Sequence, residues 1–173
     1  MAVVLLETEI RAKVAECIEI AENFFGVSLE PIRIEFDLKG TCGGQYCAPR
    51  EDRPERIRVN KTLAIENFSV YLSQTIPHEV AHYICRKVYG YTYRGKRVTS
   101  HGTYWKNIMT RVFGLKPERC HTYDTTNARV RHARSFAYRC DCKTWQLTAI
   151  RHNRVQKGAS YSCPKCRCVL KRG

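Results

Sequence analysis

The sequence contains no run of eighteen or more apolar residues, so it predicts no transmembrane helix. Its first residues, Met1 to Leu6, also lack the basic stretch that opens a secretory signal peptide, and they are followed by Glu7 and Glu9. These two absences predict a cytoplasmic protein with no membrane partner. Because that compartment is reducing, the ten cysteines are expected to be metal ligands or buried thiols rather than disulfides.

Acidic residues are scarce at the C-terminal end of the chain. From residue 129 to residue 173 there are twelve lysines and arginines but one acidic residue, Asp141, so most of the net charge of +14 lies there. This segregation favours a surface for a polyanion, most simply nucleic acid, over a tail that is merely solvated. The basic residues expected to contact nucleic acid are Arg139, Lys143, Arg151, Arg154 and Lys157.

One motif in the middle of the chain has a specific chemistry: residues 78–82 read His-Glu-Val-Ala-His, or H-E-x-x-H. On a helix the two histidines lie one turn apart on one face, where both imidazoles can bind a zinc ion beside the glutamate. Zinc with an open position polarises a carbonyl and acidifies its bound water, whose proton a carboxylate can take. Such short patterns also arise by chance. Here, however, apolar neighbours such as Val80 and Ile84 predict a buried helix, where unpartnered polar side chains would be costly.

A third zinc ligand does not follow at the short metzincin spacing, because eighteen residues separate His82 from His101. His101 is still the best candidate, since it opens a new helix and precedes Gly102, beside which a neighbouring backbone can approach closely. The alternatives are Glu118, His121 and Asp124. The ligand must therefore come from a separate element.

The segments before the motif predict a helix followed by strands. Apolar residues at helical spacing predict an amphipathic helix over residues 7–25 that ends at Gly26. Strict alternation predicts a half-buried strand over residues 32–38, and a short strand is expected over residues 57–60. Between them lies a glycine-rich stretch along which an extended substrate could pair in a protease. The predicted substrate-binding residues are Gly40, Thr41, Cys42, Gly43 and Gly44.

The segments around the motif predict two further helices. Pro77 breaks a helix interior, so either a helix over residues 65–75 bends there or the motif helix begins at Pro77, and Gly90 ends it. Residues 91–98 predict a loop whose aromatic and basic side chains either stack on unpaired bases or pack as a connection. A further helix follows, with Ser100 as its N-cap.

Two cysteine pairs, Cys140-x-Cys142 and Cys163-x-x-Cys166, are separated by twenty residues. Four thiolates from two such turns form a closed tetrahedral zinc site of the ribbon type, and so short a segment needs such a site to fold. The first pair is tighter than usual, so Cys168 or His152 could replace one of its members. The residues between the pairs that alternate as in a strand are Trp145, Leu147 and Ile150.

The order of these motifs resembles the SprT family, whose eukaryotic relatives include Spartan. The motifs that carry the resemblance are Gly40-Thr41 before a glycine-rich strand, Ile76-Pro-His-Glu-Val-Ala-His82, His101-Gly-x-x-Trp105, Tyr138-Arg-Cys-x-Cys142, Arg151-His-Asn-Arg154 and Tyr161-x-Cys-x-x-Cys166. The resemblance covers nearly the whole chain. The chain departs from the family pattern in its additional cysteines and in residues 91–98.

The resemblance implies an α+β fold with three parts: a zincin-like metalloprotease domain over residues 1–127, a basic linker over 128–135, and a small zinc-ribbon domain over 136–173 that binds nucleic acid. It implies two zinc ions, one catalytic and one structural. The implied ligands of the catalytic zinc are His78, His82 and His101. The implied ligands of the structural zinc are Cys140, Cys142, Cys163 and Cys166.

The resemblance also implies roles and partners. Glu79 would be the general base, and His121 would be a further catalytic residue that stabilises an oxyanion, unless it only packs or caps. The Spartan branch is a DNA-dependent metalloprotease that degrades proteins crosslinked to DNA. The implied function is thus a monomeric zinc endopeptidase that acts on DNA-associated or DNA-crosslinked proteins in DNA–protein crosslink repair, at the nucleoid if the source is bacterial. The implied partner is single-stranded DNA or a single-strand/double-strand junction. The alternative is a nucleic-acid-binding adaptor whose H-E-x-x-H site is structural or inactive. A zinc nuclease fits less well, because the additional carboxylates of two-metal sites are missing.

Overall fold

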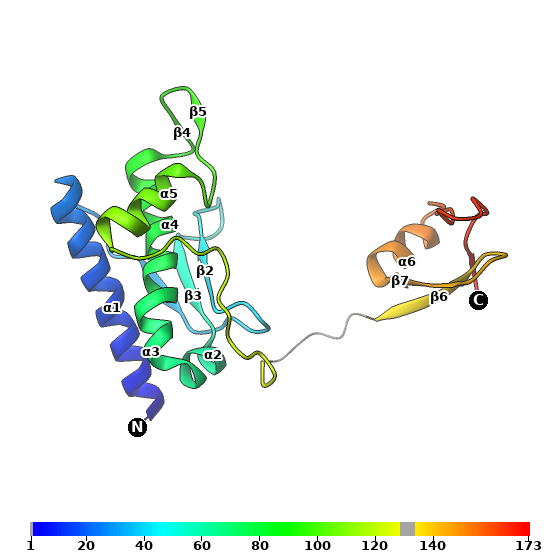
Figure 1. Cartoon of the computed structure of the whole chain (residues 1–173), viewed down its shortest axis with the longest axis horizontal. Coiled ribbons are helices and arrows are strands. Elements are labelled where there is room, and N and C mark those ends of the chain that lie inside the picture. Colours follow the sequence, from blue (N-terminus) through cyan, green and yellow to red (C-terminus); the bar gives the residue numbers. More distant parts are fainter. Residues whose placement is uncertain (1, 129–133) are drawn as a thin grey trace. The chain divides into compact units, whose positions relative to one another are not determined.

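The computed structural model describes residues 2–128 and 134–173 (Figure 1). These residues form two compact units, one before the gap and one after it. Five residues of the predicted basic linker, 129–133, lie outside the described residues, and with them Arg129 and Arg131 of the basic C-terminal segment. Within the described ranges, no helix is both long enough and apolar enough to span a membrane. Helices and strands mix in both units, which confirms the predicted α+β class.

The first unit opens with the long helix α1 (Ala2–Phe25), which begins five residues before the predicted helix. Its apolar stripe faces the core, since Ile10, Val14 and Ala21 are at most 3% exposed. Gly26 ends the helix with a positive φ of 64°, and its N–H donates to the carbonyl oxygen of Glu22 at 2.8 Å. The predicted period and stop are thus confirmed, and the stripe packs against α4 (Figure 1).

A three-stranded sheet follows, with β1 (Arg33–Glu35), β2 (Gly44–Cys47) and β3 (Arg56–Val59) in the order β1-β3-β2. β1 pairs parallel and β2 pairs antiparallel with the central strand β3. β1 is shorter than the predicted strand over residues 32–38. The inner face of the sheet contributes Ile34, Ile57 and Val59 to the core. Because β2 lies at the edge of the sheet, one side of its backbone is not paired with another strand.

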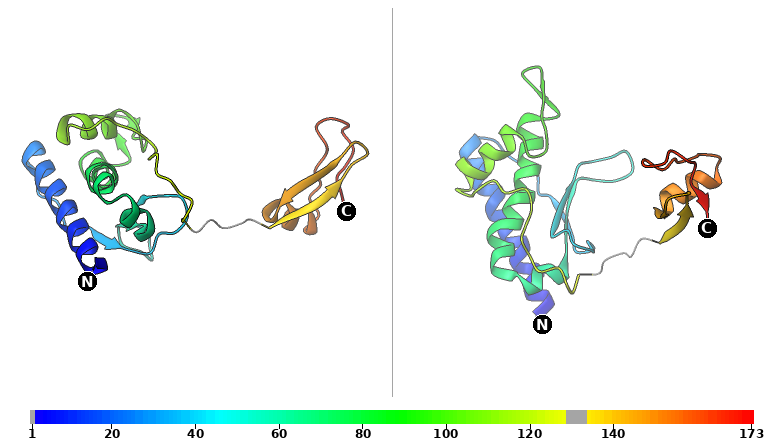
Figure 2. Two further views of the ribbon diagram at one scale, coloured as in Figure 1. Left: turned by 60° about the horizontal axis from the view of Figure 1, so that its bottom comes forward. Right: turned by 45° about the vertical axis from the view of Figure 1, so that its right-hand side comes forward.

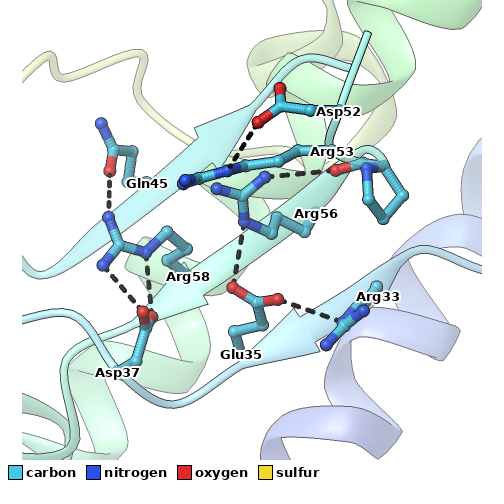
Figure 3. Close-up of polar contacts among 9 residues, drawn as sticks. Arg33, Glu35, Asp37, Gln45, Asp52, Arg53, Arg56 and Arg58 are labelled. Atoms are coloured by element: carbon cyan, nitrogen blue, oxygen red, sulfur yellow. Dashed lines mark hydrogen bonds and ion pairs between the residues drawn. The ribbon is translucent and has the colours of Figure 1, made fainter. Parts of the chain in front are cut away.

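The other face of this sheet and the turn beside it carry charged side chains that contact one another (Figure 3). Their arginines are paired with carboxylates at distances of 2.9 to 3.4 Å. The pairs are Arg33–Glu35, Arg56–Glu35, Arg58–Asp37 and Arg53–Asp52. Pairing of this kind is the usual arrangement for an arginine that is partly removed from water.

Three short helical segments lead into the motif helix: α2 (Lys61–Glu66), α3 (Phe68–Val70) and the π-helical turn η1 (Tyr71–Thr75). Asn67 interrupts the predicted helix over residues 65–75, but α3, η1 and the motif helix α4 (Ile76–Tyr89) follow one another without a gap, and Thr75 and Ile76 have helical dihedrals. The predicted alternative of a helix that runs into the motif helix therefore fits from Phe68 onward. Pro77 lies in the first turn of α4, and Gly90 ends the helix with a φ of 67°. The π-helical turn immediately before α4 accommodates a residue that has no N–H to donate.

Residues 91–98 form a hairpin of β4 (Thr92–Tyr93) and β5 (Lys96–Arg97), not the predicted loop, and it projects beyond α4 (Figures 1 and 2). Arg94 and Gly95 at its tip both have positive φ, the requirement of a tight type I′ turn. Tyr93 packs against Tyr89 and Tyr104, with ring centroids 5.0 and 5.3 Å away. That aromatic side chain is therefore used within the fold.

The last helical segment of the first unit consists of α5 (Thr103–Asn107) and the π-helical turn η2 (Ile108–Val112). The predicted N-cap at Ser100 is wrong, because the residue before α5 is Gly102 and no side chain caps the helix. A Cβ at Gly102 would collide with Thr99, so glycine is required there by a close approach. Trp105 and Ile108 are fully buried and anchor this segment in the core.

The second unit contains β6 (Ser135–Arg139), β7 (Thr144–Thr148), α6 (Ala149–Gln156) and β8 (Lys171–Arg172) (Figure 2). The strands pair antiparallel in the order β7-β6-β8. The predicted strand through Ile150 is wrong beyond Thr148, since Ile150 lies in α6 and is 68% exposed. The small core is made of Tyr138, Leu147, Cys163 and Leu170.

Candidate functional site

Three imidazoles meet in the first unit. His78 and His82 lie one turn apart on α4, and His101 reaches them from the segment before α5. Their Nε2 atoms are mutually 3.1, 3.2 and 3.3 Å apart. A tetrahedral zinc site with Zn–N bonds of about 2.0–2.1 Å has N···N edges of about 3.3–3.4 Å. The three nitrogens therefore fit zinc, and the structure brings together all three of the predicted catalytic-zinc ligands.

Burial keeps these histidines neutral. Burial, with the neighbouring imidazoles as the second cause, lowers the pKa of His78 to about 4 and that of His82 to about 3. The pKa of His101 is lowered as well, first by burial and then by Arg119. A neutral imidazole offers a lone pair to a metal ion without first losing a proton. At neutral pH all three nitrogens can therefore act as ligands.

Trp105 holds the three rings in place. It is fully buried, and its ring centroid lies 4.7 Å from those of His78 and His101 and 5.5 Å from that of His82. Its indole N–H donates to the main-chain oxygen of His78 at 3.4 Å. A single side chain thus packs against all three predicted ligands, which restricts their rotamers before any metal binds.

Glu79 lies on the same turn of α4 as His78 and is only 7% exposed. Burial raises the pKa of its carboxyl group from 4.5 to about 7, although the N–H of Tyr46 donates to Oε2 at 2.7 Å and favours the charged form. A carboxyl group with a pKa near neutrality can both accept and return a proton. The position predicted for the general base therefore has the matching acidity.

Glycine at position 44 is required by this carboxylate. A Cβ on Gly44 would lie 2.6 Å from Cγ and 3.0 Å from Oε1 of Glu79. The backbone of β2 thus lies directly against the side chain of Glu79, and the Tyr46 N–H that holds the carboxylate belongs to the same strand. The sequence analysis expected an extended substrate along this glycine-rich stretch, whereas the group that the structure places against Gly44 is the side chain of Glu79.

Two residues that the sequence analysis did not single out hold this glycine-rich segment. Asn60 is 2% exposed, and its side-chain amide donates to the carbonyl oxygens of Gly40 and Cys42 at 2.8 and 3.0 Å. The hydroxyl of the fully buried Tyr71 donates to the carbonyl oxygen of Gly43 at 2.7 Å. Asn60 also caps α2, and an asparagine before a helical pattern is the signal that could have identified it.

The predicted substrate-binding residues do not form one open surface. Gly43 and Gly44 are buried, while the side chains of Thr41 and Cys42 are exposed. On the side of β2 that β3 leaves unpaired, the Tyr46 N–H donates to Glu79 and the Gly44 carbonyl accepts from the Cys42 thiol at 2.9 Å. A peptide pairing along this edge must therefore compete with those two internal bonds.

His121 lies beside the glycine-rich segment, where its Nε2 accepts the N–H of Gly43 at 3.1 Å. With His78, Glu79 and Cys42 it lines a cavity of about 100 Å³. The bond to Gly43 places the acceptor lone pair on Nε2, so the ring holds the segment in position. Of the other alternative ligands, Glu118 lines the same cavity, and Asp124 is exposed and accepts from Thr126.

The second unit gathers four cysteines, Cys140, Cys142, Cys163 and Cys166. The sulfur of Cys142 lies 3.4 Å from that of Cys140 and 3.6 Å from those of Cys163 and Cys166. Zn–S bonds of about 2.3 Å give S···S edges of about 3.8 Å in a tetrahedral site, so the cluster fits zinc. The N–H of Cys166 lowers the pKa of Cys163, which favours the thiolate that binds metal.

The two alternative ligands of this cluster lie elsewhere. The Cys168 thiol donates to a carboxylate oxygen of Asp141 at 3.0 Å. His152 is buried in the core of the unit, where its ring stacks on Phe136 and its Nδ1 meets the Tyr138 hydroxyl at 3.0 Å. His152 therefore has a packing role that fixes α6 against β6.

The five basic residues predicted to contact nucleic acid are all exposed. In residues 134–173, no lysine or arginine forms an ion pair with a carboxylate. Arg139 follows Tyr138 on β6, so it points to the sheet face opposite the one that packs against α6, whereas Arg151 and Arg154 lie on α6 itself. The structure therefore divides the predicted basic surface between two sides of the unit.

Comparisons with known proteins agree on one family. The SprT-like family model matches residues 14–121. The chain is similar to Protein SprT of Vibrio parahaemolyticus, with 36% identity over 164 residues that cover 93% of this chain and 92% of the relative. Protein SprT of Pasteurella multocida is 31% identical over 166 residues, which cover 95% and 93% of the two chains. Protein SprT of Pseudomonas paraeruginosa is 35% identical over 164 residues, which cover 93% and 92%. No solved structure matches the chain at a significant level.

Proposed function

This chain belongs to the SprT-like family, and we propose that it is a zinc-dependent endopeptidase that acts on proteins bound or crosslinked to DNA. The observation that carries the proposal is the triangle of Nε2 atoms from His78, His82 and His101, with the buried Glu79 beside it. Three neutral nitrogens and an adjacent carboxylate are the donor set of a zinc hydrolase with one open coordination position.

In the proposed mechanism the residues of this chain move one proton. Zinc held by the three histidines would supply Lewis-acid polarisation of the scissile carbonyl and an acidified water. Glu79 accepts the proton of the attacking water and later donates it to the leaving amine, a task for which a pKa of about 7 is suited. The Tyr46 N–H holds Oε2, so the other carboxylate oxygen, Oε1, is the one that carries the proton.

We infer that the peptide substrate lies along the unpaired side of β2. This strand is at the edge of the sheet, and its backbone lies against Glu79. An extended peptide there would pair with the main-chain groups of β2 that Glu79 and Cys42 do not occupy, and would bring a carbonyl group near the three histidines. This geometry supports a zincin-like domain up to residue 127. His121 would support catalysis by holding Gly43, and through it the strand that binds the substrate.

We also infer that the second unit, over residues 136–173, is a zinc ribbon that brings the protease to DNA. The support is the fit of four sulfur atoms to a tetrahedral zinc site, together with exposed basic residues that have no acidic partner within residues 134–173. When lysines and arginines bind phosphates, counterions are released from the DNA, and this release gives affinity without sequence preference. A protein crosslinked to DNA would offer a peptide to the first unit and phosphates to the second.

The test compares the wild-type chain with Glu79→Gln, which keeps the shape of the side chain and removes the base. Both are loaded with zinc and incubated with a DNA-bound protein, with and without single-stranded DNA, and protein and DNA are followed on gels. The proposal expects fragments of the protein with the wild type alone and intact DNA throughout. Equal proteolysis by Glu79→Gln would refute the role of Glu79.

The second candidate function is a nucleic-acid-binding adaptor. The unpaired basic residues of the second unit favour it, because they need no active protease to bind DNA. In that case DNA binding would weaken with salt in both proteins, and neither would cleave any protein substrate. The same experiment therefore separates the two functions.

A further inference from the structure

Arg86 is an arginine without a carboxylate partner beside the candidate active site. It lies on α4, one turn after His82, and its Nε and Nη1 atoms are buried with no hydrogen-bond partner. The arginines on the open face of the sheet differ, because each of those shown in Figure 3 has a carboxylate within 3.4 Å. Buried guanidinium N–H groups without an acceptor are costly and uncommon.

The residues around Arg86 hold its guanidinium group in place, but none of them accepts a hydrogen bond from Nε or Nη1. Its Cζ atom lies over the ring of Tyr91, 3.0 Å from the ring centroid, and the ring offers no strong hydrogen-bond acceptor to the N–H groups. The neighbouring carboxylate, Glu55, already accepts from the Tyr46 hydroxyl at 2.5 Å and from Lys87 at 2.8 Å through its two oxygens. Both oxygens of Glu55 are thus already paired, and no ion pair joins this carboxylate to Arg86.

A cavity of about 60 Å³ lies at this guanidinium group. Its walls are Arg86, the ring of Tyr46 on β2, the candidate zinc ligand His82, and the segment Val98–Ser100. The cavity is thus lined both by Tyr46, on the strand proposed to pair with the substrate, and by His82, one of the three histidines proposed to hold zinc. A side chain of a peptide bound along β2, close to the bond to be cut, has this cavity as its neighbour.

We propose that this cavity is a specificity pocket in which Arg86 binds the carboxylate of an aspartate or glutamate next to the scissile bond. The inference rests on the proposed endopeptidase function. The guanidinium group is held against Tyr91, and either of its unpartnered groups, Nε–H or Nη1–H, can form a bidentate pair with a carboxylate together with the adjacent Nη2. A small cavity admits a short acidic side chain. An amide of the same shape would leave a donor facing the arginine and lose the charge-assisted bonds.

The test uses zinc-loaded full-length protein and matched fluorogenic peptides that carry Asp, Asn or Lys on either side of the cleaved bond. The wild type is expected to have a kcat/KM about 10- to 100-fold higher for one Asp position than for Asn, the range of a charge-assisted hydrogen bond. Arg86→Met should lower kcat/KM for the Asp peptide relative to the Asn peptide until the ratio between the two is about 1. Arg86→Glu should reverse the preference in favour of the Lys peptide.

The matched control is Arg33→Met, which removes one positive charge from the far strand of the sheet, where Arg33 is largely exposed and pairs with Glu35. This variant should keep the wild-type preference for the Asp peptide. A loss of the preference in Arg86→Met alone would then come from the pocket and not from a weaker general attraction of acidic peptides to a basic protein. Zinc content and melting temperature show whether each variant is folded. An equal loss of cleavage for all peptides in Arg86→Met would overturn the proposal, because Arg86 would then act on structure or on the peptide main chain.

A binding arm keeps this inference separate from the proposed function. Labelled Asp and Asn peptides are titrated against the Glu79→Gln protein with and without Arg86→Met, and fluorescence anisotropy is measured. If the wild type cleaves nothing but the Asp peptide binds tightly only when Arg86 is present, the endopeptidase function fails and the pocket stands. If Arg86→Met instead weakens binding of a single-stranded oligonucleotide and leaves the peptide preference intact, Arg86 binds phosphate and the proposal is refuted.

Discussion

Replacing Glu79 with glutamine should stabilise the metal-free chain at alkaline pH. Burial raises the pKa of this carboxyl group from 4.5 to about 7, so the folded state disfavours the charged form that the unfolded chain adopts freely. A raised pKa contributes stability that is fully present below about pH 4.5 and is lost as pH rises through about 7. Glutamine does not titrate, and its carbonyl oxygen can still accept the Tyr46 N–H.

The magnitude follows from the two pKa values. With about 1.4 kcal/mol for each pKa unit, the difference between the folded and unfolded pKa values of Glu79 lowers the free energy of unfolding by about 1 kcal/mol at pH 5 and by about 3 kcal/mol at pH 8. The gain from Glu79→Gln should therefore increase by about 2 kcal/mol between these two pH values. Zinc should reduce the gain, because a nearby cation favours the carboxylate.

The assay is urea unfolding of both metal-free proteins at pH 5 and pH 8, followed by far-ultraviolet circular dichroism. The histidines titrate in the wild type and in the variant alike, so their contribution cancels when the stabilities of the two proteins are subtracted at each pH. A stability difference that stays constant between pH 5 and pH 8 would refute the reasoning, because it would mean that Glu79 is not desolvated in the folded chain.

Three further predictions concern the metal, the strand and the DNA surface. His82→Ala should bind one zinc ion where the wild type binds two, as measured by elemental analysis, and retention of both would contradict the assigned ligands. Gly44→Ala places a Cβ 2.6 Å from Glu79 Cγ and should cost about 1–3 kcal/mol in stability. It should also reduce cleavage with unchanged zinc content, and wild-type cleavage would show that β2 does not position the carboxylate. Removing the charges of Arg151 and Arg154 together should reduce the slope of log affinity against log salt for single-stranded DNA by about 1.4 if α6 contacts DNA, whereas an unchanged slope would exclude that side of the unit.

The sequence predicts best those elements whose side chains face one core. The helical period over residues 7–25 identified α1 because its buried side chains all belong to one core, mainly against α4. The helix α6 was missed because His152 is its one buried residue, so it has no apolar stripe to detect. The alternation of apolar residues extended the predicted strand to Ile150, but it does not reflect burial there, since the Ile150 side chain is exposed. The hairpin over residues 91–98 depends on positive φ angles at its tip, which a glycine only suggests.

The candidate site divides in the same way. Two histidines and a glutamate at helical spacing can be recognised locally, because one turn of α4 contains them all. The contact between Gly44 and Glu79 joins residues far apart in the chain, and no local pattern reports it. The same holds for Asn60, whose amide reaches Gly40 and Cys42 across the fold. The unpaired state of Arg86 can be seen only when the partners of every neighbouring carboxylate are known.

The central claim is that Glu79 and the three histidines hydrolyse peptide bonds. The most direct measurement compares wild type and Glu79→Gln at equal zinc content on an unfolded protein substrate, with the new N-termini identified by mass spectrometry. The account predicts new N-termini with the wild type and none above background with Glu79→Gln. New termini at equal rates from both proteins would contradict it.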